Sequence, residues 1–478
     1  MRGLIVLKFI GYMLMVFSFF FIPPLIMTVF LNESDWMAFL NSGLITFFIG
    51  FVLSRLHQKQ VELRRSDGFL IVVLVWATIG FFAILPFVLS DINVSFIDAF
   101  FEATSGITTT GASVFRHLNK MPYGIQFYHQ ELQFIGGLGV VAIASALLPL
   151  MKIGGIHLYF ADMPGPSKEQ KLLPQLSDGM ATVCKIYLAS ALFCFVGYFL
   201  SGLTLFESVC EMFSTVSTGG FTLNEESFTN YNVYTQVIAI ICMIFGAINF
   251  QLHYLWIFKK QISCYWQDIE CVRFFQLLTI ISLIVFGILM HYRVYDDPNT
   301  TFINTVFNVV SLITTSGLIV GHFSDWPSFL PELMVVLSMI GACGGSTAGG
   351  IKIIRVIICS RQSVVMLRKL IHPSAIIKPT IKGSPIREEM INSVMAFMVL
   401  YFYIFVTLII LMIGTGLDLF NSFAAIAACI SNVGVGINQV SYNEVHYMTK
   451  IIMIFAMLIG RIEIMTFFAI LLPSFWRS

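Results

Sequence analysis

Long apolar stretches recur along the chain and alternate with short polar connections. Each stretch is poor in charge and near the ~20 residues that a helix needs to cross about 30 Å of hydrocarbon. The pattern predicts an all-α membrane protein with ten long membrane segments, which run roughly over Leu4–Leu31, Trp36–Ser54, Gly68–Ser90, Gln133–Met151, Ile186–Phe206, Val233–Phe258, Phe274–Met290, Leu333–Ile351, Met390–Leu417 and Ile451–Trp476. The first run is too long for a removable signal peptide, so we expect it to remain as a membrane helix.

Four stretches of sixteen residues align with one another without a gap, which indicates an internal repeat. They read FIDAFFEATSGITTTG, LFESVCEMFSTVSTGG, FINTVFNVVSLITTSG and LFNSFAAIAACISNVG. Each lies between two of the long apolar segments. We therefore predict four tandem units of membrane helix, pore helix, extended tail and membrane helix around one pore, preceded by an extra N-terminal helix pair.

The third residue of each stretch is polar, and we expect a short helix to begin there because Asp and Asn cap free backbone N–H groups. These residues are Asp98, Glu207, Asn304 and Asn421. About nine residues can follow as a helix, which is about 14 Å at 1.5 Å per residue and half of a membrane. The chain must then turn back within the membrane.

The last four residues of each stretch form a tail that ends in glycine, and hydroxyl groups are frequent in it. Extended backbone at membrane depth is tolerated only where protein buries it or where it lines a water-filled cavity. Carbonyl and hydroxyl oxygens from four tails can replace the hydration shell of a monovalent cation, and the negative helix ends favour that charge. The alternative is an ancient duplication whose loops only pack. The predicted filter residues are Thr108, Thr109, Thr110, Gly111, Ser217, Thr218, Gly219, Gly220, Thr314, Thr315, Ser316, Gly317, Ser431, Asn432, Val433 and Gly434.

A second glycine-rich segment, Gly341–Gly350, interrupts the last apolar segment of the third unit. Five glycines in ten residues do not hold a stiff helix, so we predict a flexible intramembrane flap across the pore. A glycine-rich face for helix packing is the alternative. The segment has the spacing of a phosphate-binding loop, but Ile351 stands where that motif needs lysine. A regulatory nucleotide would therefore have to bind another chain.

Arg461 is the one basic residue well inside an apolar segment, in a helix that we expect to continue to Trp476. An unpaired charge costs at least about 2.5–3.5 kcal/mol at the centre of a membrane helix, so Arg461 should face protein or water. Glu463 is two residues away and does not share its helix face, which makes it a poor partner. We predict that Arg461 lies below the filter and holds the flap shut; the alternative is a structural arginine between helix ends. The predicted gate residues are Gly344, Gly345, Ser346, Thr347, Gly349, Gly350, Lys352 and Arg461.

The composition agrees with a membrane protein, because 57% hydrophobic and 11% charged residues exclude a water-soluble globular chain. The net charge is only +1, but 22 of the 27 Lys and Arg residues fall on one set of alternate loops. The positive-inside rule then places both termini in the cytoplasm. The other loops carry acidic residues, which predicts a cation-attracting outer mouth unless these are ordinary solvated charges. The partner that we expect is the lipid bilayer and not a nucleic acid.

The nine cysteines include no CxxC pair and mostly lie in apolar segments, so they indicate neither a metal site nor disulfides. No nucleophile or His/Cys/Asp cluster faces a common depth, which argues against an enzyme. We expect no resident cofactor, and the only metal that we expect is the transported ion at the filter.

The chain resembles the TrkH family of pore-forming subunits of bacterial Trk potassium uptake systems, in the superfamily that also holds KtrB. The four glycine-ending tails carry the resemblance, together with GGSTAGGIKIIR from Gly344, GRIEIMTFF from Gly460 and the terminal PSFWRS. It covers essentially the full length. It implies potassium uptake across the bacterial inner membrane, a homodimer, and control by a cytosolic TrkA-like nucleotide-binding ring. The fourth tail departs most from the family pattern, with Ser431, Asn432 and Val433.

The eight basic residues from Lys352 to Arg387 predict an exposed cytoplasmic loop on which the TrkA-like ring docks, although a solvated loop without a partner is also consistent with them. An ion-coupled sodium or proton symporter with alternating access is the competing function. Such transporters often have inverted repeats and intramembrane carboxylates, whereas these repeats run in one orientation and only Glu463 lies deep. The expected divisions are residues 1–66 (helix pair), 67–152, 175–260 and 270–360 (first three units), 361–388 (cytoplasmic loop) and 389–478 (fourth unit).

Overall fold

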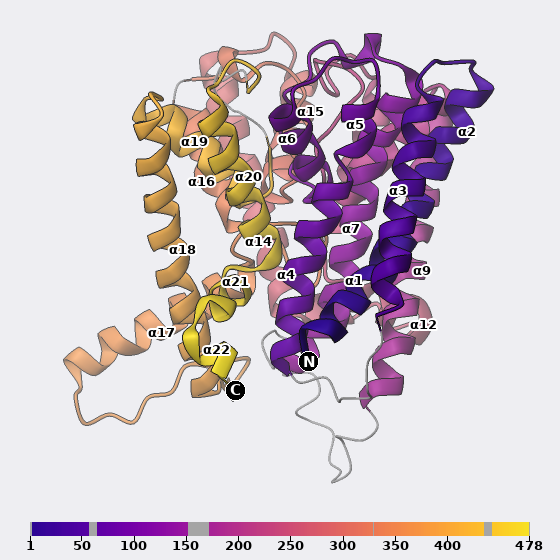
Figure 1. Ribbon diagram of the computed structural model, residues 1–478. Helices are drawn as coiled ribbons and strands as arrows, with labels where there is room; N and C mark the ends of the chain where they lie inside the picture. The colour runs from indigo at the N-terminus through magenta and orange to yellow at the C-terminus, as the bar shows by residue number, and fades with distance from the viewer. Residues whose placement is uncertain (1, 57–64, 152–171, 328, 435–441, 478) are drawn as a thin grey trace.

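A computed structural model of the protein describes residues 2–56, 65–151, 172–327, 329–434 and 442–477, and these residues fold mainly as α-helices (Figure 1). The sheet found among them is one short hairpin, in which β1 (Thr380–Ile381) pairs antiparallel with β2 (Ser384–Pro385). Both ends of the chain lie at the same end of the molecule, which is the lower end in Figure 1. The architecture is therefore the all-helical one that the apolar pattern predicts.

The N-terminal helices form a tight pair beside the rest of the protein. Helix α1 (Arg2–Ser18) continues through η1 (Phe19–Phe21) into α2 (Ile22–Phe30), and α3 (Trp36–Ser54) runs back along α1. Glycines allow the close approach, because a Cβ atom at Gly11 would lie 2.7 Å from the carbonyl oxygen of Gly50. Small residues at such crossings let membrane helices pack by backbone contact.

The remaining helices follow the order membrane helix, short helix, membrane helix. The first group is α4 (Arg65–Phe82), α5 (Leu85–Leu89), α6 (Phe96–Ile107), η2 (Leu118–Lys120) and α7 (Tyr123–Met151). The second is α9 (Leu172–Leu200), α10 (Leu205–Ser217), α11 (Val233–Ala247), α12 (Phe250–Lys259) and α13 (Cys264–Gln267). The third is α14 (Ile269–Tyr292), α15 (Pro298–Ile313), η3 (Phe323–Asp325), α16 (Phe329–Ile340) and α17 (Ile353–Ile371). The fourth is α18 (Glu388–Gly414), α19 (Leu419–Ile430), α20 (Tyr447–Ile462), α21 (Ile464–Leu471) and α22 (Pro473–Arg477).

Two of the expected membrane segments are sharply bent between two helices. The segment expected over Val233–Phe258 bends by 98° between α11 and α12, and α20 turns by 102° into α21. The expectation of a helix that continues to Trp476 is therefore wrong, because Glu463 at the bend has a φ of 72° that ends an α-helix. In the described ranges, six helices are long and apolar enough to cross a membrane, or eight if each bent pair is one span.

The short helices begin before the residues that the sequence indicated. Their N-caps are Ser95, Thr204, Asp297 and Asp418, whose side chains each accept a backbone N–H three residues later. Asp98, Glu207 and Asn421 occupy that third position, and Glu207 completes a capping box with Thr204. In α15 the helix begins at Pro298, so Asn304 lies well inside it. Acidic side chains in a first turn still complement the positive helix end.

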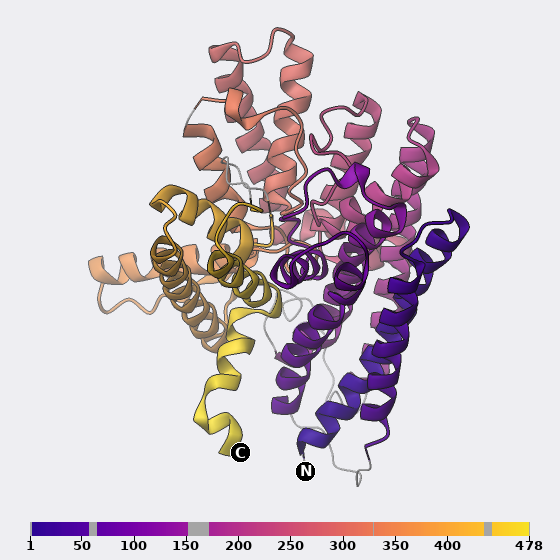
Figure 2. The same cartoon turned by 45° about the horizontal axis from the view of Figure 1, so that its top comes forward.

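The units follow one another around the molecule in chain order, as Figure 2 shows from purple through magenta and orange to yellow. The chain links each unit to the next, but the fourth unit must meet the first without a covalent link. It does so by packing α20 against α6, and α20 and α21 against α4. The arrangement therefore closes on itself around a common centre, where the tails of α6, α10, α15 and α19 lie.

Candidate ion pore and gating segment

The four glycine-ending tails share one backbone shape. The second residue of each tail is left-handed, with φ between 51° and 57° at Thr109, Thr218, Thr315 and Asn432. The terminal glycine of each is also left-handed, with φ between 71° and 91°. A left-handed non-glycine residue costs about 1–3 kcal/mol, and such strain is retained mainly at functional sites. Four copies of the same strained shape indicate four equivalent parts of one site.

The glycines at the tail ends lie against one another and have no room for side chains. A Cβ atom at Gly220 would be 2.6 Å from the carbonyl oxygen of Ser316 and 3.6 Å from Cα of Gly111. A Cβ atom at Gly434 would be 2.5 Å from the carbonyl carbon of Gly111. The third, second, first and fourth tails are thus neighbours in that order. The structure brings the sixteen predicted filter residues into one cluster in which hydroxyl and carbonyl oxygens predominate.

Hydrogen bonds within and between tails hold the hydroxyl groups in place. Thr108 and Thr110 share a bond of 2.7 Å between their Oγ1 atoms, and Thr314 and Ser316 share the equivalent one at 2.9 Å. Asn432 Nδ2 donates to Thr110 Oγ1 at 2.9 Å, which links the fourth tail to the first. The asparagine that departs from the family pattern therefore bridges two tails.

Gln133 of α7 is a site residue that the sequence did not reveal. Its Nε2 donates to the carbonyl oxygen of Gly219 at 2.6 Å, and its Oε1 accepts the N–H of Phe221 at 3.2 Å. One buried side chain thus supports the second tail on both sides of Gly220. The only sequence signal was a glutamine in an apolar segment, which names no partner.

The predicted flap is a non-helical segment between α16 and α17 that runs beneath the tails. The backbone N–H and Oγ1 of Thr347 both donate to the carbonyl oxygen of Gly246, at 3.1 and 3.0 Å. Thr218 Oγ1 lies 3.2 Å from Thr347 Oγ1, and the N–H of Gly349 donates to Thr315 Oγ1 at 2.6 Å. The segment is therefore in contact with the second and third tails.

Glu270 of α14 fixes the base of this segment and was also missed by sequence reasoning. Its Oε1 accepts the N–H groups of Gly344, at 2.7 Å, and Ile354, at 3.1 Å. The ammonium group of Lys352 donates to the carbonyl oxygen of Ala348. One carboxylate thus ties Gly344 to the start of α17, while the lysine bonds back to Ala348 between them.

Arg461 of α20 reaches the same segment from the fourth unit. Its Nη1 donates to the carbonyl oxygen of Thr347 at 2.9 Å, and the residue is only 8% exposed. Its other guanidinium nitrogens, Nε and Nη2, have no hydrogen-bond partner in the part of the chain that the structure describes. Glu463 does not pair with Arg461 but with Arg355 at the start of α17. Arg355 in turn lies over the ring of Phe397, 4.0 Å from its centroid.

The basic segment after the flap is not a plain loop. Helix α17 extends away from the bundle in Figure 1 and is followed by the β1–β2 hairpin. Arg355 is buried and Lys352 is partly buried, so two of the eight basic residues are not on the exposed surface. The other six are exposed: Arg361, Arg368, Lys369, Lys378, Lys382 and Arg387.

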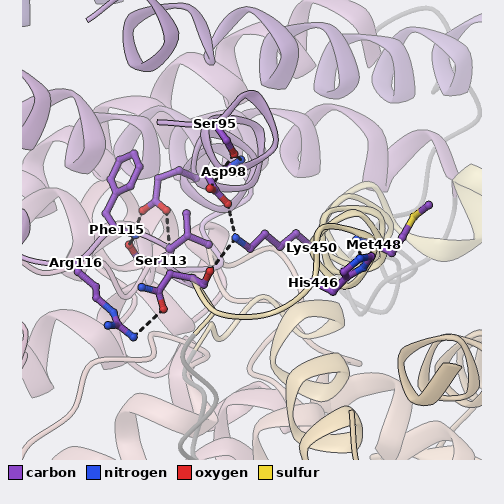
Figure 3. A network of polar contacts seen from close by, with 11 residues as sticks. Ser95, Asp98, Ser113, Phe115, Arg116, His446, Met448 and Lys450 are labelled. Atoms are coloured by element: carbon purple, nitrogen blue, oxygen red, sulfur yellow. Dashed lines mark hydrogen bonds and ion pairs between the residues drawn. The ribbon is translucent and has the colours of Figure 1, made fainter. Parts of the chain in front are cut away.

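A polar network joins the first and fourth units at the end of the molecule opposite the termini (Figure 3). Lys450 of α20 pairs with Asp98 of α6 at 2.5 Å and also donates to the carbonyl oxygen of Asn443 at 3.2 Å. Arg116 donates to Asn443 Oδ1 at 3.0 Å and to Glu444 at 2.5 Å. This network closes the one junction between units that the chain itself does not link.

Comparison with known proteins finds relatives along nearly the whole chain. The model of the TrkH family, described as a cation transport protein, matches residues 35–476. The Trk system potassium uptake protein TrkH of Vibrio parahaemolyticus is 35% identical over 482 residues, which cover 99% of each chain. The Trk system potassium uptake protein TrkG of Escherichia coli K12 is 36% identical over 473 residues, 98% of this chain and 97% of that one.

A solved structure is similar to the same extent. The crystal structure of the potassium transporter TrkH from Vibrio parahaemolyticus superposes with a TM-score of 0.93 at 33% sequence identity, and the match covers 100% of both chains. These relatives are named as transport proteins and not as enzymes.

Proposed function

The chain belongs to the TrkH family of cation transport proteins, which confirms the resemblance found in its motifs, and we propose that it takes up potassium through one channel-like pore. The observation that carries the proposal is the cluster of four tails with one strained backbone shape and interlocking glycines. A ring of backbone carbonyl and hydroxyl oxygens suits a dehydrated monovalent cation. Each short helix also directs its negative C-terminal end toward the cluster, which favours a cation there.

The filter of this pore consists of Thr108–Gly111, Ser217–Gly220, Thr314–Gly317 and Ser431–Gly434. Four helix–pore helix–helix units with ten membrane segments and the divisions given above surround it. The protein resides in the bacterial inner membrane with both termini in the cytoplasm. This orientation is supported by the excess of basic residues on one set of loops and by the two termini lying at one end.

The gate of the pore is the segment Gly344–Lys352 together with Arg461. In the conformation described here the segment is bonded to two tails and to the carboxylate of Glu270. Arg461 adds a positive charge below the filter and a bond to Thr347. A positive charge repels a potassium ion that leaves the filter, and the bond holds the segment across the pathway. Opening requires the segment to release both contacts.

Regulation comes from a cytosolic TrkA-like nucleotide-binding ring that docks on α17 and the β1–β2 hairpin of a homodimer. The exposed basic residues of this region and its direct connection to the gate segment support the assignment. Reversing the charge of Arg368 and Lys369 should abolish co-purification with a TrkA-like protein. Charge reversal of Lys259 and Lys260, another exposed basic pair, is the matched control and should leave binding intact. Equal binding by both double variants would remove α17 as the docking surface.

Flux of radioactive rubidium into proteoliposomes tests the transport function. A pore carries rubidium down its gradient without a coupling ion, and potassium should compete with rubidium more strongly than sodium does. An alternating-access symporter would instead need an inward gradient of sodium ions or protons to drive the uptake. Uptake that stops when that gradient is collapsed would favour the symporter, and equal competition by sodium and potassium would contradict a selective filter.

A further inference from the structure

Three of the four pore helices have a polar side chain at the same position. Each of these side chains forms a hydrogen bond with the backbone that follows the tail of its own unit. This position is the seventh residue of each sixteen-residue stretch: Glu102, Glu211 and Asn308. The N–H group that each side chain accepts belongs to the third residue after the tail glycine. The distances are 2.8 Å from Glu102 to Val114, 3.0 Å from Glu211 to Leu223 and 3.1 Å from Asn308 to Val320.

Each of these side chains makes a second contact that fixes its direction. Glu102 also accepts the hydroxyl of Ser113 at 2.7 Å, and Glu211 accepts the hydroxyl of Tyr231 at 3.0 Å. Asn308 Nδ2 donates to the carbonyl oxygen of Val320 at 2.7 Å, so this asparagine bonds both backbone groups of one residue. All three side chains are at most 1% exposed. A buried side-chain oxygen that loses its hydrogen-bond donor costs free energy. The folded state therefore favours keeping each of these hydrogen bonds to the returning backbone.

The side chain of Glu102 is also connected to the second tail through His129. Glu102 is paired with His129 of α7, and the His129 ring stacks on Phe221 with 3.7 Å between centroids. Phe221 directly follows Gly220, the last residue of the second tail. The fourth unit has Ala425 at the equivalent position, and its methyl side chain cannot form such a bond. The polar contact is thus a property of three units out of four.

We propose that Glu102, Glu211 and Asn308 are positioning residues for ion selectivity, an inference that rests on the proposed potassium pore. Each tail continues from its pore helix at one end and is bonded back to that helix at the other. The tail is then a closed loop whose carbonyl oxygens cannot move apart or together freely. Discrimination between potassium and the smaller sodium ion depends on the number and the freedom of these oxygens. These residues act through the tails and do not touch the ion.

Asn308→Leu tests the inference, because it removes both bonds to Val320 with little change in volume. Asn304→Leu is the matched control, since Asn304 lies one turn earlier on α15 and has no hydrogen bond to the returning chain among those that the structure describes. The measured quantity is the ratio of sodium to potassium concentrations that halve rubidium uptake into proteoliposomes. We expect Asn308→Leu to lower this ratio about fivefold, the factor that corresponds to one net hydrogen bond, and Asn304→Leu to leave it unchanged.

A conservative variant separates positioning from general stability. Asn308→Asp keeps the acceptor for the Val320 N–H group but loses the donor, and carboxylates already serve in the first two units. We expect an intermediate ratio and a smaller loss of thermal stability than in Asn308→Leu, because only one of the two bonds is lost. A wild-type ratio in folded Asn308→Leu overturns the inference, and if that variant does not fold, a wild-type ratio in Asn308→Asp overturns it. If the unmutated protein shows no discrimination at all, the proposed potassium pore fails instead.

Discussion

The first three pore loops and the fourth are held by different means. In the first three, a polar side chain of the pore helix bonds the chain three residues beyond the tail glycine. In the fourth, Ala425 stands at that position, and the bonds to the tail come from the first tail, from α20 and from Tyr442. Asn432 bonds Thr110 of the first tail and the carbonyl oxygen of Met457, and Tyr442 donates to the carbonyl oxygen of Gly434 at 3.2 Å.

The difference shows that four tails of one shape need not have four equal supports. Each of the first three tails is bonded to its own pore helix, and the second is also supported by Gln133 of the first unit. The fourth depends on the first tail and on its own α20 helix, which also carries Arg461 to the gate segment. A movement of α20 would therefore reach both the gate and the fourth tail. In the proposed pore, the fourth unit is therefore the one best placed to couple gating to the filter.

Gly220→Ser should produce the largest loss of selectivity. It distorts the second tail, which is otherwise held by Glu211 and Gln133. The residue is left-handed at a φ of 91°, and a Cβ atom would collide with the carbonyl oxygen of Ser316. We expect the potassium-over-sodium preference of rubidium uptake to fall by about tenfold or more, as a strained and crowded position costs several kcal/mol. Gly287→Ser on α14 is the control, because a Cβ atom there meets nothing within 4 Å. Preserved selectivity in Gly220→Ser would place the filter elsewhere.

Arg461→Ala should have the next largest effect, on flux and not on selectivity. The substitution removes the bond to Thr347 and the positive charge that α20 brings beneath the filter. A bond from a charged group is worth about 1.5–3 kcal/mol, so we expect resting rubidium uptake to rise about tenfold. Arg361→Ala, which removes an exposed arginine of α17, should leave uptake unchanged. Unchanged uptake in a correctly inserted Arg461→Ala protein would leave this arginine with a structural role only.

The backbone of the tails and the break in the helix at Gly341–Gly350 were predictable from the sequence because they depend on residue type at fixed spacing. The glycine at the end of each tail is required by a left-handed backbone, and this requirement is visible without coordinates. The predicted start of each pore helix was wrong, because more than one position near a helix start favours polar residues. Asp98 and Glu207 are acidic residues typical of a first turn, but the capping residues are Ser95 and Thr204, three positions earlier. Polar side chains stabilise a helix start both at the N-cap and three residues later. Residue type alone therefore does not show which of the two positions is the N-cap.

The bends and the supporting contacts were not predictable. Hydropathy describes the segments through Asn249 and Glu463 as continuous, because it contains no information on backbone angles. The partners of Glu102, Gln133 and Glu270 come from other elements or from a loop many residues away. A polar residue in an apolar segment indicates that it needs a hydrogen-bond partner, but the sequence does not identify that partner. The residues that support the tails were therefore missed, while the tails themselves are visible in the sequence.

Lys450→Met tests the junction on which the fourth unit depends. Lys450 is 6% exposed, and its ion pair with Asp98 joins α20 to α6. Removing one partner of a buried pair costs about 3–5 kcal/mol, but the Asp98 side chain is 29% exposed, so we expect a loss of about 1–2 kcal/mol in stability. Thermal unfolding in detergent measures it.

The control and the coupling for this junction come from three further variants. Arg116→Met disrupts the pair with Glu444, whose side chains are 53% and 69% exposed, and should change the melting temperature much less. Asp98→Asn, measured alone and combined with Lys450→Met, completes a double-mutant cycle. A coupling energy near zero would show that packing alone closes the ring between the first and fourth units.

Tyr442→Phe should have the smallest effect and gives the sharpest test of the comparison. The change removes one hydroxyl that donates to the carbonyl oxygen of Gly434 at 3.2 Å and leaves the aromatic ring against Phe101. The fourth tail keeps its bonds through Asn432, so we expect selectivity to fall by less than about twofold, below the fivefold expected for Asn308→Leu. Both variants are measured by sodium and potassium competition with rubidium uptake in the same liposomes. A loss of selectivity in Tyr442→Phe as large as that in Asn308→Leu would mean that the fourth tail relies on a single bond as heavily as the third tail relies on its pore helix, and the distinction between the two kinds of support would then no longer hold.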